Sequence, residues 1–492
     1  MMSEKLKKGR KYMDYMLKIR QDDQPSFHLT GGVGWINDPN GFSVYKGEYH
    51  LFYQHHPYRT RWGDIHWGHV KTKDFITWER LPEALAPDQE YDEQGCFSGT
   101  AIETPDGKHL LIYTGVSFMN DENGVMTEYQ QTNIAIGDGV NYEKYNLNPV
   151  IGTDMIPEGN DLSDFRDPKI MYEDGRYYCL MASRGADGSG EILMYESPDA
   201  KNWKFTTVLE ACCNQYGRMW ECPDFFELDG KQVLIVSPQE MRATGLEFHA
   251  GYNTAALIGM WNSAEKKFYR EYIQSIDYGL DFYAPQTLKA TDGRRIMIAW
   301  MQNWTTSTCA EKDHKFYGQM TLPRELSIDN GRLIQGPVRE IENYYGELTA
   351  YHNVYVNGEI SLQKIEGRML DMSVHIRPAY PNSYRDFRIV VAKDGINETS
   401  VSFKPDKNKV RVDRTKCGFP YDIIGIRDFL VSQNQGEIDL RIILDRYSME
   451  VFVNGGEQAA SSLIYTDFEA DGISFRCDGE AFFDVEKHDL KF

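Results

Sequence analysis

The chain has 492 residues and carries 53 basic against 74 acidic side chains, which gives a net charge of −21. Such an acidic surface repels phosphate backbones, so nucleic acid is excluded as an expected partner. There is no run of 18 apolar residues, so we expect no membrane span and no membrane partner. With 41% hydrophobic residues the chain can fill a sizeable core, and its length favours two domains.

The N-terminal extension, residues 1–25, differs from the rest of the chain. Its segment YMDYMLKI, flanked by Lys and Arg, predicts a short helix packed outside the main fold. The extension lacks the apolar segment of a signal peptide, and the eight cysteines include no CxxC pair. We therefore expect a cytoplasmic protein with reduced thiols and with neither a metal ion nor another cofactor.

Five turn dipeptides recur along residues 26–340, and their glycines lie 60, 68, 55 and 63 residues apart. The turns are Lys46-Gly47, Asp106-Gly107, Asp174-Gly175, Asp229-Gly230 and Asp292-Gly293. A run with the composition of a strand, such as YHLFYQ or KQVLIVSP, closely follows each turn. The alternative is a chance repetition of a common turn. The regular spacing instead favours five sheets of about four strands each, which is a five-bladed β-propeller.

The pattern changes after Pro337. Segments such as ISLQKI, KVRVD and DLRIILDR alternate apolar and polar residues from about residue 350 onward. This alternation predicts a second all-β domain over residues 350–492, a β-sandwich, with the boundary near residue 340. We expect this domain to have a structural role or to form a homodimer, and to carry no chemistry of its own.

Polar residues occupy a common position in the repeat, eight to ten residues before each turn glycine. They are Asp38, Ser98, Asp167, Glu221 and Tyr283. In a propeller this position is one end of the innermost strands, which line the channel. Three carboxylates that meet there raise one another's pKa, which is typical of a functional site. Calcium is the alternative, but the chain has no D-x-D-x-D-G loop.

Cleavage of a glycosidic bond needs one carboxylic acid that protonates the leaving oxygen and a second carboxylate that attacks or activates water. Aromatic residues near the three carboxylates could form walls on which a sugar stacks. These are Trp35, Trp62, Phe97, Trp220 and Tyr283. The spacing therefore predicts a glycosidase. A non-catalytic sugar-binding propeller is the alternative from another class, but it has no need of three carboxylates.

Three segments carry a family resemblance: WINDPNG at residues 35–41, FRDPK at 165–169 and WECPDF at 220–225. They resemble, in order, the signature motifs of glycoside hydrolase family 32, the invertases and fructanases. The resemblance extends to ILDRYSMEVFVNGG in the second domain and covers nearly the whole chain. The departures are small: Ile36 replaces a usual Met, and His56 stands where Asn is common.

The resemblance implies a five-bladed propeller followed by a β-sandwich, and a retaining β-fructofuranosidase acting on sucrose-like sugars. It implies that Asp38 is the nucleophile, Glu221 the general acid/base and Asp167 the transition-state stabiliser. It further implies substrate contacts from Asn37, Gln54, Trp62, Phe97, Ser98, Arg166, Asp224, Tyr283 and Trp300. An exo-fructanase and a fructosyltransferase share these motifs and stay open as alternatives, as does an inverting arabinan-cleaving propeller enzyme.

Neighbouring residues suggest how the three carboxyls differ. We expect Trp220 to provide apolar cover that keeps Glu221 protonated, and Arg166 to keep Asp167 ionised. Cys222 is interpreted as a small buried residue without a redox role.

Two arginines, Arg59 and Arg61, directly precede Trp62. Because guanidinium groups suit phosphate oxygens, they could hold a 6-phosphate on the glucose unit of the substrate. The alternative is that both are solvated surface charges.

Overall fold

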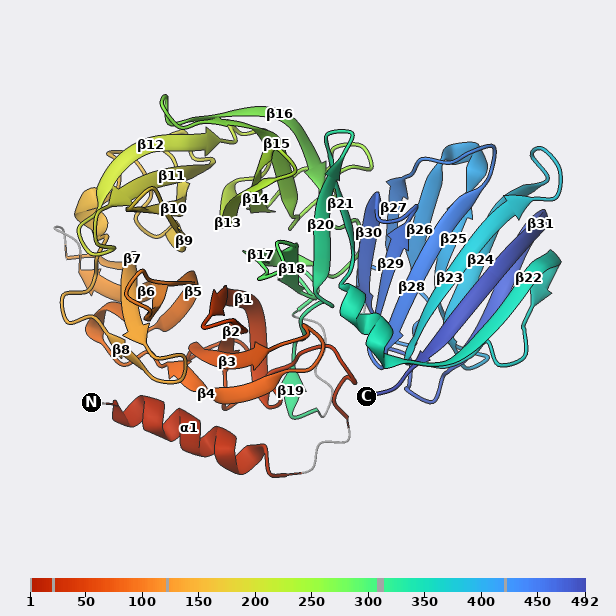
Figure 1. Ribbon diagram of the computed structural model, residues 1–492, viewed down its shortest axis with the longest axis horizontal. Helices are drawn as coiled ribbons and strands as arrows, with labels where there is room; N and C mark the ends of the chain where they lie inside the picture. Colours follow the sequence, from red (N-terminus) through yellow and green to blue (C-terminus); the bar gives the residue numbers. More distant parts are fainter. Residues whose placement is uncertain (1, 20–22, 121–123, 308–313, 420–422) are drawn as a thin grey trace.

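The computed structural model describes residues 2–19, 23–120, 124–307, 314–419 and 423–492. A ring of five sheets, formed by the first two thirds of the chain, lies beside a sheet-rich C-terminal domain (Figure 1). The predicted five-bladed propeller followed by a β-sandwich is confirmed.

Each blade has four antiparallel strands, and the first strand of each blade lies nearest the centre of the ring (Figure 1). Blade 1 contains β1 (Gly34–Tyr45), β2 (Glu48–His56), β3 (His66–Thr72) and β4 (Glu79–Leu85), and blade 2 contains β5 (Gly95–Glu103), β6 (His109–Asn120), β7 (Met126–Gly137) and β8 (Tyr142–Lys144). Blade 3 contains β9 (Phe165–Glu173), β10 (Arg176–Arg184), β11 (Gly190–Ser197) and β12 (Lys204–Ala211), and blade 4 contains β13 (Met219–Leu228), β14 (Lys231–Gln239), β15 (Ala255–Asn262) and β16 (Lys267–Ser275). Blade 5 contains β17 (Tyr283–Lys289), β18 (Arg295–Trp300), β20 (Arg324–Asp329) and β21 (Arg332–Pro337).

All five predicted turns join the first strand of a blade to the second. At three of them, Lys46-Gly47, Asp174-Gly175 and Asp229-Gly230, both residues have positive φ, as in the tight hairpin turns that glycine favours. The repeat in the sequence therefore reports one hairpin per blade, at the end of the channel away from the candidate site.

A short strand closes the ring. The chain between β18 and β20 extends to blade 1, where β19 (Phe316–Tyr317) pairs in parallel with the start of β1. Between blades, apolar side chains of neighbouring sheets pack face to face, for example Phe52 and Trp67 of blade 1 against Leu111 and Tyr113 of blade 2. The inner strands of the blades are thus buried on both faces, and the blades stack around the ring.

Helix α1 (Glu4–Met16) begins earlier than the segment YMDYMLKI suggested, because the Ser3 hydroxyl caps it by accepting from the Leu6 N–H. Its buried face, with Leu6 and Met13, packs beside β4. Within the described ranges, no helix is long and apolar enough to cross a membrane.

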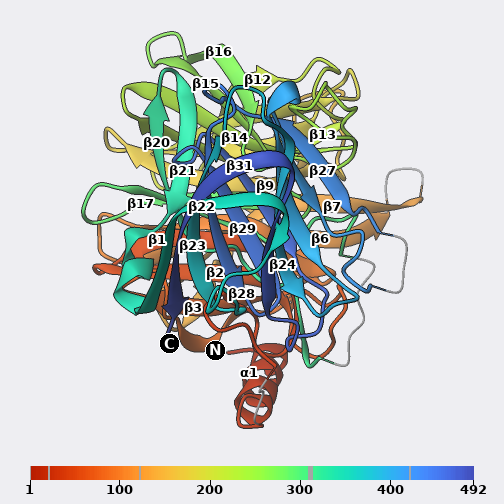
Figure 2. The same cartoon turned by 90° about the vertical axis from the view of Figure 1, so that its right-hand side faces the viewer.

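Ten strands form the C-terminal domain, which Figure 2 shows in front of the propeller. They are β22 (Tyr345–Ile360), β23 (Leu370–Pro378), β24 (Tyr384–Lys393), β25 (Thr399–Lys404), β26 (Lys409–Asp413), β27 (Ile426–Leu430), β28 (Ile438–Asp445), β29 (Ser448–Val453), β30 (Gln458–Leu463) and β31 (Gly472–Leu490). The first part of β31 pairs with β24 and its second part pairs with β23, so the long strand belongs to two layers. Alternate residues of β23, including Leu370 and Met372, fill the core between the layers.

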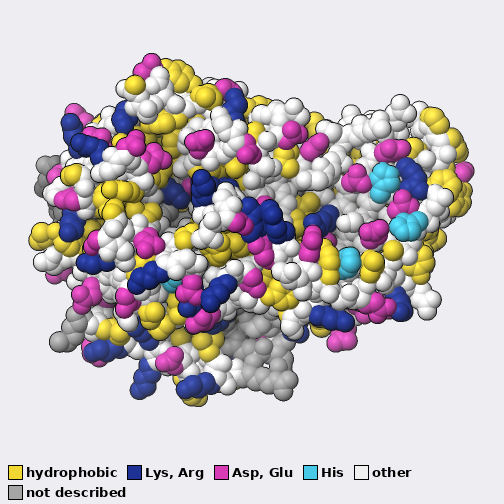
Figure 3. All heavy atoms as spheres, viewed as in Figure 1, with side chains coloured by type: hydrophobic (Ala, Val, Ile, Leu, Met, Phe, Trp, Pro, Cys, Tyr) yellow, Lys and Arg dark blue, Asp and Glu magenta, His cyan; other side chains and the backbone are white. Residues whose placement is uncertain are grey.

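Short 3-10 helices occupy several connections: η1 (Glu90–Asp92), η2 (Thr153–Met155), η3 (Arg339–Tyr344) and η4 (Pro405–Lys407). Of these, η3 lies between the last propeller strand and β22. On the face shown in Figure 3, acidic and basic side chains are interspersed.

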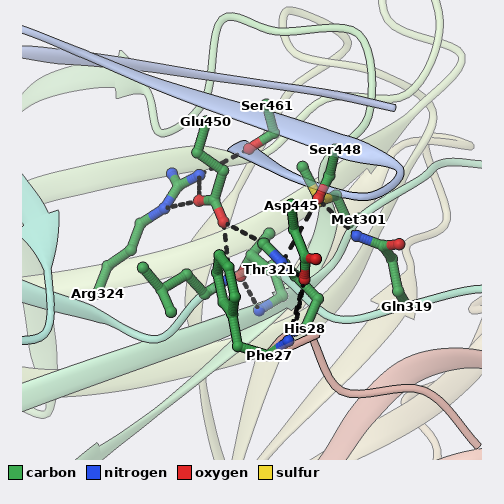
Figure 4. Close-up of polar contacts among 12 residues, drawn as sticks. Phe27, His28, Met301, Gln319, Thr321, Arg324, Asp445, Ser448, Glu450 and Ser461 are labelled. Carbon is green, nitrogen blue, oxygen red and sulfur yellow. Dashed lines mark hydrogen bonds and ion pairs between the residues drawn. The ribbon is translucent and has the colours of Figure 1, made fainter. Parts of the chain in front are cut away.

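A buried network of charges joins the two domains (Figure 4). Arg324 of the propeller pairs with Glu450 of β29 at 2.6 Å and with Asp277 at 2.9 Å. The two ring nitrogens of His28 contact Asp445 at 2.9 Å and Glu450 at 3.0 Å. All of these side chains are inaccessible to solvent, so water does not compete with the ion pairs that join the two domains.

Candidate active site

The five innermost strands share an irregularity at the same level. Each strand has a register shift against its neighbour, and the shifts include Asp38, Ser98, Asp167, Cys222 and Ala284. Three of these residues have positive φ and precede a proline: 60° at Asp167, 49° at Cys222 and 51° at Ala284. Such strained backbone in repeated β-bulges re-aims side chains and is typical of functional sites.

Asp38 is 7% exposed and is held by neutral hydrogen-bond donors. The Ser98 hydroxyl donates to its Oδ2 at 2.7 Å, and the Asn37 amide donates to its Oδ1 at 3.1 Å. Gln54 contacts both donors, Ser98 and Asn37. Burial and the nearby charge of Glu221 raise the pKa of Asp38 to about 6, although the hydrogen bonds oppose this rise.

Glu221 has ionic and phenolic partners instead. The Arg166 Nε and Nη2 atoms both lie 2.9 Å from Glu221 Oε1, and the Tyr283 hydroxyl donates to Oε2 at 2.6 Å. Arg166 is expected to keep Asp167 ionised. Burial and the charge of Glu221 raise the pKa of Asp167, the charge of Arg166 lowers it as expected, and the hydrogen bonds of the guanidinium go to Glu221 and not to Asp167. The guanidinium reaches across to the neighbouring strand β13 and also contacts Asp164 at 2.7 Å.

The expectation that Trp220 provides apolar cover for Glu221 is wrong. Trp220 packs inside its blade with residues such as Phe248, and its indole N–H donates to the Tyr216 carbonyl at 2.8 Å. Because consecutive residues of a strand point to opposite faces, Trp220 and Glu221 cannot face the same space.

Asp167 lies beside Cys222, which also contacts Asp38, the candidate nucleophile. The Cys222 backbone N–H donates to Asp167 Oδ2 at 2.9 Å, and the Cys222 sulfur lies 3.6 Å from that oxygen and 3.7 Å from Asp38 Oδ2. Burial and the charge of Glu221 raise the pKa of Asp167. Burial and the carboxylates also raise the pKa of the Cys222 thiol well above its usual value, so the sulfur stays protonated. Cys222 is thus buried as expected, but it also contacts two carboxylates.

Among the expected substrate contacts, Trp62 is the most exposed, at 47%. Its ring meets the edge of Phe97 with a centroid distance of 5.8 Å. Trp300 is fully buried in a cluster with Trp35 and Tyr283, which gives it a supporting position behind the site.

Asp224 lies apart from this group, and its contact with substrate stays a prediction. Its carboxylate is buried, lies 2.9 Å from the Lys169 ammonium and accepts from the Thr287 N–H at 2.7 Å. Asp224 follows the bulge of β13, so it bridges strands β9 and β17 farther along the channel.

Several supporting residues were not predicted. Gln130 accepts from Arg166 Nη1 at 3.2 Å, and the Asp167 N–H donates to the Thr114 hydroxyl at 2.9 Å. Tyr317 stacks on Trp35 with a centroid distance of 4.9 Å and an interplanar angle of 7°. Asp164 directly precedes the FRDPK motif, so the sequence could have indicated it as a supporting residue. No sequence feature indicates Tyr317, because it lies in the connecting segment between β18 and β20.

Across the described part of the chain, no group of three or more His, Cys, Asp or Glu side chains has an arrangement that could hold a metal ion. The carboxylates of this site instead contact hydroxyl, amide, guanidinium and phenol groups.

The comparisons with known proteins cover both domains. The family model of the glycosyl hydrolases family 32 N-terminal domain matches residues 28–337, and that of the family 32 C-terminal domain matches residues 340–490. A raffinose invertase of Escherichia coli is 34% identical, over 92% of this chain and 91% of its own. A sucrose-6-phosphate hydrolase of Zymomonas mobilis is 34% identical, over 94% of this chain and 91% of its own.

Solved structures agree with these relatives. A family 32 β-fructofuranosidase of Bombyx mori has a TM-score of 0.83 and 32% identity, and the match covers 99% of this chain and 97% of that one. A sucrose-6-phosphate hydrolase of Lactobacillus gasseri has a TM-score of 0.82 and 27% identity, with 100% and 97% covered. The propeller, the three carboxylates and these matches together show that this chain belongs to glycosyl hydrolase family 32 and is a glycoside hydrolase.

Proposed function

We propose that the protein is a retaining β-fructofuranosidase of the cytoplasm that releases terminal fructose from sucrose, sucrose 6-phosphate or short fructo-oligosaccharides. The observation that carries the proposal is the difference between the partners of two carboxylates at one level of the channel. Asp38 has neutral donors from serine and asparagine, whereas Glu221 has the Arg166 guanidinium and the Tyr283 phenol. The names of the relatives, raffinose invertase and sucrose-6-phosphate hydrolase, support this substrate class.

In the first step, a carboxylate oxygen of Asp38 forms a bond to the anomeric carbon of the fructosyl unit. The bond from that carbon to the leaving oxygen breaks, and Glu221 transfers its proton to this oxygen. The Ser98 and Asn37 donors hold Asp38 in the attacking orientation. Asp167, fixed by the Cys222 N–H, is the group that we assign to the fructose hydroxyls and to the transition state.

In the second step, Glu221 takes a proton from water, and the water oxygen attacks the anomeric carbon. The bond to Asp38 breaks, so fructose leaves and both carboxyls return to their starting states. Arg166 and Tyr283 contact both oxygens of Glu221 and can stabilise it while it is ionised between the steps. Dimerisation through the C-terminal domain stays a prediction.

Each of the two steps inverts the configuration at the anomeric carbon, so the mechanism as a whole retains it. Methanol, which can replace water in the second step, tests this outcome. With sucrose and methanol, the enzyme is expected to release methyl β-D-fructofuranoside, identified by carbon NMR before it is hydrolysed. A parallel reaction without enzyme controls for chemical methanolysis. The α-anomer as first product would contradict the covalent mechanism and favour direct attack by water.

The pH profile provides a second prediction. Asp38 attacks only when ionised, and its pKa is raised to about 6, so kcat/KM is expected to fall as pH decreases through about 6. The Ser98→Ala variant removes a hydrogen bond that lowers this pKa, so its acid limb should move to higher pH. Ser43→Ala, which changes a buried serine of β1 outside the carboxylate cluster, is the matched control. The assignment would be wrong if the limb moved in the control and not in Ser98→Ala.

A further inference from the structure

The loop between β2 and β3, residues 57–65, connects the surface of blade 1 to the centre of the candidate site. Its last residue, Ile65, is completely buried in the cluster that contains Cys222 and Tyr283, whose side chains contact the three carboxylates. The Ile65 carbonyl also accepts from the Cys96 N–H at 2.9 Å, which joins the loop to β5. The backbone of this loop is therefore tied to the elements that hold the carboxylates.

The middle of the loop carries Trp62, which is 47% exposed and is an expected substrate contact. Its ring meets the Phe97 ring edge-on, with a centroid distance of 5.8 Å. Phe97 directly precedes Ser98, whose hydroxyl donates to Asp38 Oδ2 at 2.7 Å. The position of Trp62 relative to Asp38 therefore depends on the course of the loop.

Helix α1 contacts this loop near both of its ends. Near the start of the loop, the Tyr12 ring meets the Tyr58 ring edge-on with a centroid distance of 5.1 Å, and the Lys8 ammonium lies 5.1 Å from the centre of the Tyr58 ring. Near the end of the loop, the Lys5 ammonium lies 2.8 Å from Asp64 Oδ1. Asp64 has a φ of 39°, which is uncommon for a residue other than glycine. The ion pair therefore holds a backbone conformation that needs support from its surroundings.

A glycine lets the helix approach the loop closely. Gly9 is buried, and a Cβ atom in its place would lie 3.4 Å from Cδ2 of His66 and 3.6 Å from the Tyr58 hydroxyl. The His66 ring in turn contacts the Asp64 carbonyl at 2.6 Å. The carboxylate of Asp64 is thus held by α1 itself, and its carbonyl is held by a side chain that packs against α1.

The helix has attachments to the propeller that do not involve the loop. The Arg10 Nε atom donates to the Glu83 carbonyl of β4 at 2.9 Å, and Lys5 donates to the Pro87 carbonyl at 2.9 Å. Arg10 Nη1 also donates to Asn141, in the connection between β7 and β8, at 2.9 Å. Helix α1 therefore spans the outer strands of blades 1 and 2 and can hold the loop against a fixed frame (Figure 1).

We propose that helix α1 positions Trp62 for substrate binding by holding the loop 57–65 against the outer strands of blades 1 and 2. The inference rests on the proposed β-fructofuranosidase activity and assigns Lys5, Gly9 and Asp64 as positioning residues, which act through the loop backbone. An aromatic ring binds a sugar only at the correct distance and tilt, so a displacement of the loop by about 1 Å weakens binding.

The test measures kcat and KM of helix variants on the best of three substrates, sucrose, sucrose 6-phosphate and kestose. In Gly9→Leu the larger side chain does not fit against His66 and displaces the helix from the loop, so KM should rise about 10- to 100-fold while kcat changes less than about 3-fold. In Gly9→Ala the Cβ atom fits at a contact distance of 3.4 Å, so the rise should be far smaller.

The ion pair is tested separately. Lys5→Ala breaks a half-exposed pair and should raise KM about 2- to 5-fold, and Lys5→Arg should restore it. Lys7→Ala is the matched control, because it removes a lysine of the same helix that pairs only with the exposed Glu4 among the described contacts. It should change KM by less than about 2-fold.

A double-mutant cycle with Trp62 separates positioning from stability. Trp62→Ala should itself raise KM, and Gly9→Leu or Lys5→Ala should add almost nothing in that background, because the side chain that they position is gone. If Gly9→Leu does not fold, the cycle with Lys5→Ala decides the question.

The proposal is overturned if the effects of the helix variants and of Trp62→Ala multiply, or if the helix variants lower the melting temperature and leave KM unchanged. A Trp62→Ala variant with the KM of the wild type would also overturn it. The hydrolase assignment survives each of these outcomes, whereas a wild type that cleaves none of the three sugars would contradict the proposed function.

Discussion

The Asp38→Asn variant is expected to lose on the order of 10⁴-fold or more in kcat on sucrose while it folds normally. An amide is nearly isosteric with the carboxyl group, so the fold should survive. Its single oxygen can accept from the Ser98 hydroxyl in place of Oδ2, while the longer hydrogen bond from the Asn37 amide to Oδ1 is lost. It cannot form the covalent bond to the anomeric carbon. Single-turnover and steady-state assays on sucrose measure the loss.

The same variant should be at least as stable as the wild type at neutral pH. Asp38 has a pKa of about 6 in the folded protein, above its ordinary value of 3.8, so its ionisation disfavours the folded state. This cost grows as pH rises from about 4 to about 6 and stays constant above that range. Asparagine carries no such charge. Thermal melts at pH 4.5 and pH 7.5 should therefore show that the melting temperature of the variant, relative to that of the wild type, is higher at pH 7.5 than at pH 4.5.

Glu221→Gln is the matched control for the role of Asp38. Without the acid, sucrose cleavage should collapse, but a fructoside with a phenolate leaving group needs no protonation and should be partly spared. Asp38→Asn should lose both substrates equally. Near-normal turnover of sucrose by Asp38→Asn, or equal sparing of the phenolic substrate in both variants, would contradict the assigned roles.

Removal of the Glu450 carboxylate is expected to destabilise the protein by about 3–5 kcal/mol. Glu450 accepts hydrogen bonds from Arg324 Nε and Nη2 at 3.0 and 2.6 Å and from the Leu322 N–H at 2.7 Å, and it contacts His28 (Figure 4). In Glu450→Ala two buried cations lose a shared anion in a space that excludes water. Differential scanning calorimetry measures the effect on the melting temperature.

The pH dependence distinguishes this network from a simple packing defect. The two carboxylates raise the pKa of His28 to about 9 against the opposing effect of burial. The stabilisation from charged His28 is complete below pH 6.5 and is lost as pH rises through about 9. The difference between wild type and Glu450→Ala should therefore narrow between pH 7 and pH 10.

Glu469→Ala, an exposed carboxylate of the same domain, is the control and should change the melting temperature little. Glu450→Gln keeps the shape and removes only the charge. A Glu450→Ala variant that melts like the control, or a difference that widens toward pH 10, would show that the buried charges do not hold the domains together.

Local sequence features predicted the architecture because each blade repeats one hairpin. Turns such as Asp174-Gly175 need positive φ, which glycine supplies at no steric cost, so the turn chemistry is visible without any structure. The carboxylates could be found for a related reason. Asp38 and Asp167 both precede a proline, and the prolines mark the bulges that bring these side chains into the channel.

The partners of those carboxylates could not be predicted in this way. Arg166 is adjacent to Asp167 in the chain, yet its guanidinium contacts Glu221, because consecutive strand residues diverge and the next blade is closer. Asp224 lies three residues after Glu221, but a bulge separates them in β13, and the Asp224 carboxylate forms an ion pair with Lys169.

The sequence by itself determined the number of blades, the level of the three carboxylates and the two-domain order, since these depend on turns, spacing and strand patterns within short segments. Only the tertiary structure decided which groups surround each carboxyl, how Tyr317 reaches Trp35, and that Arg324, Glu450 and His28 meet between the domains. Those contacts join residues far apart in the chain, and their geometry follows from how blades and layers pack, which no local pattern records.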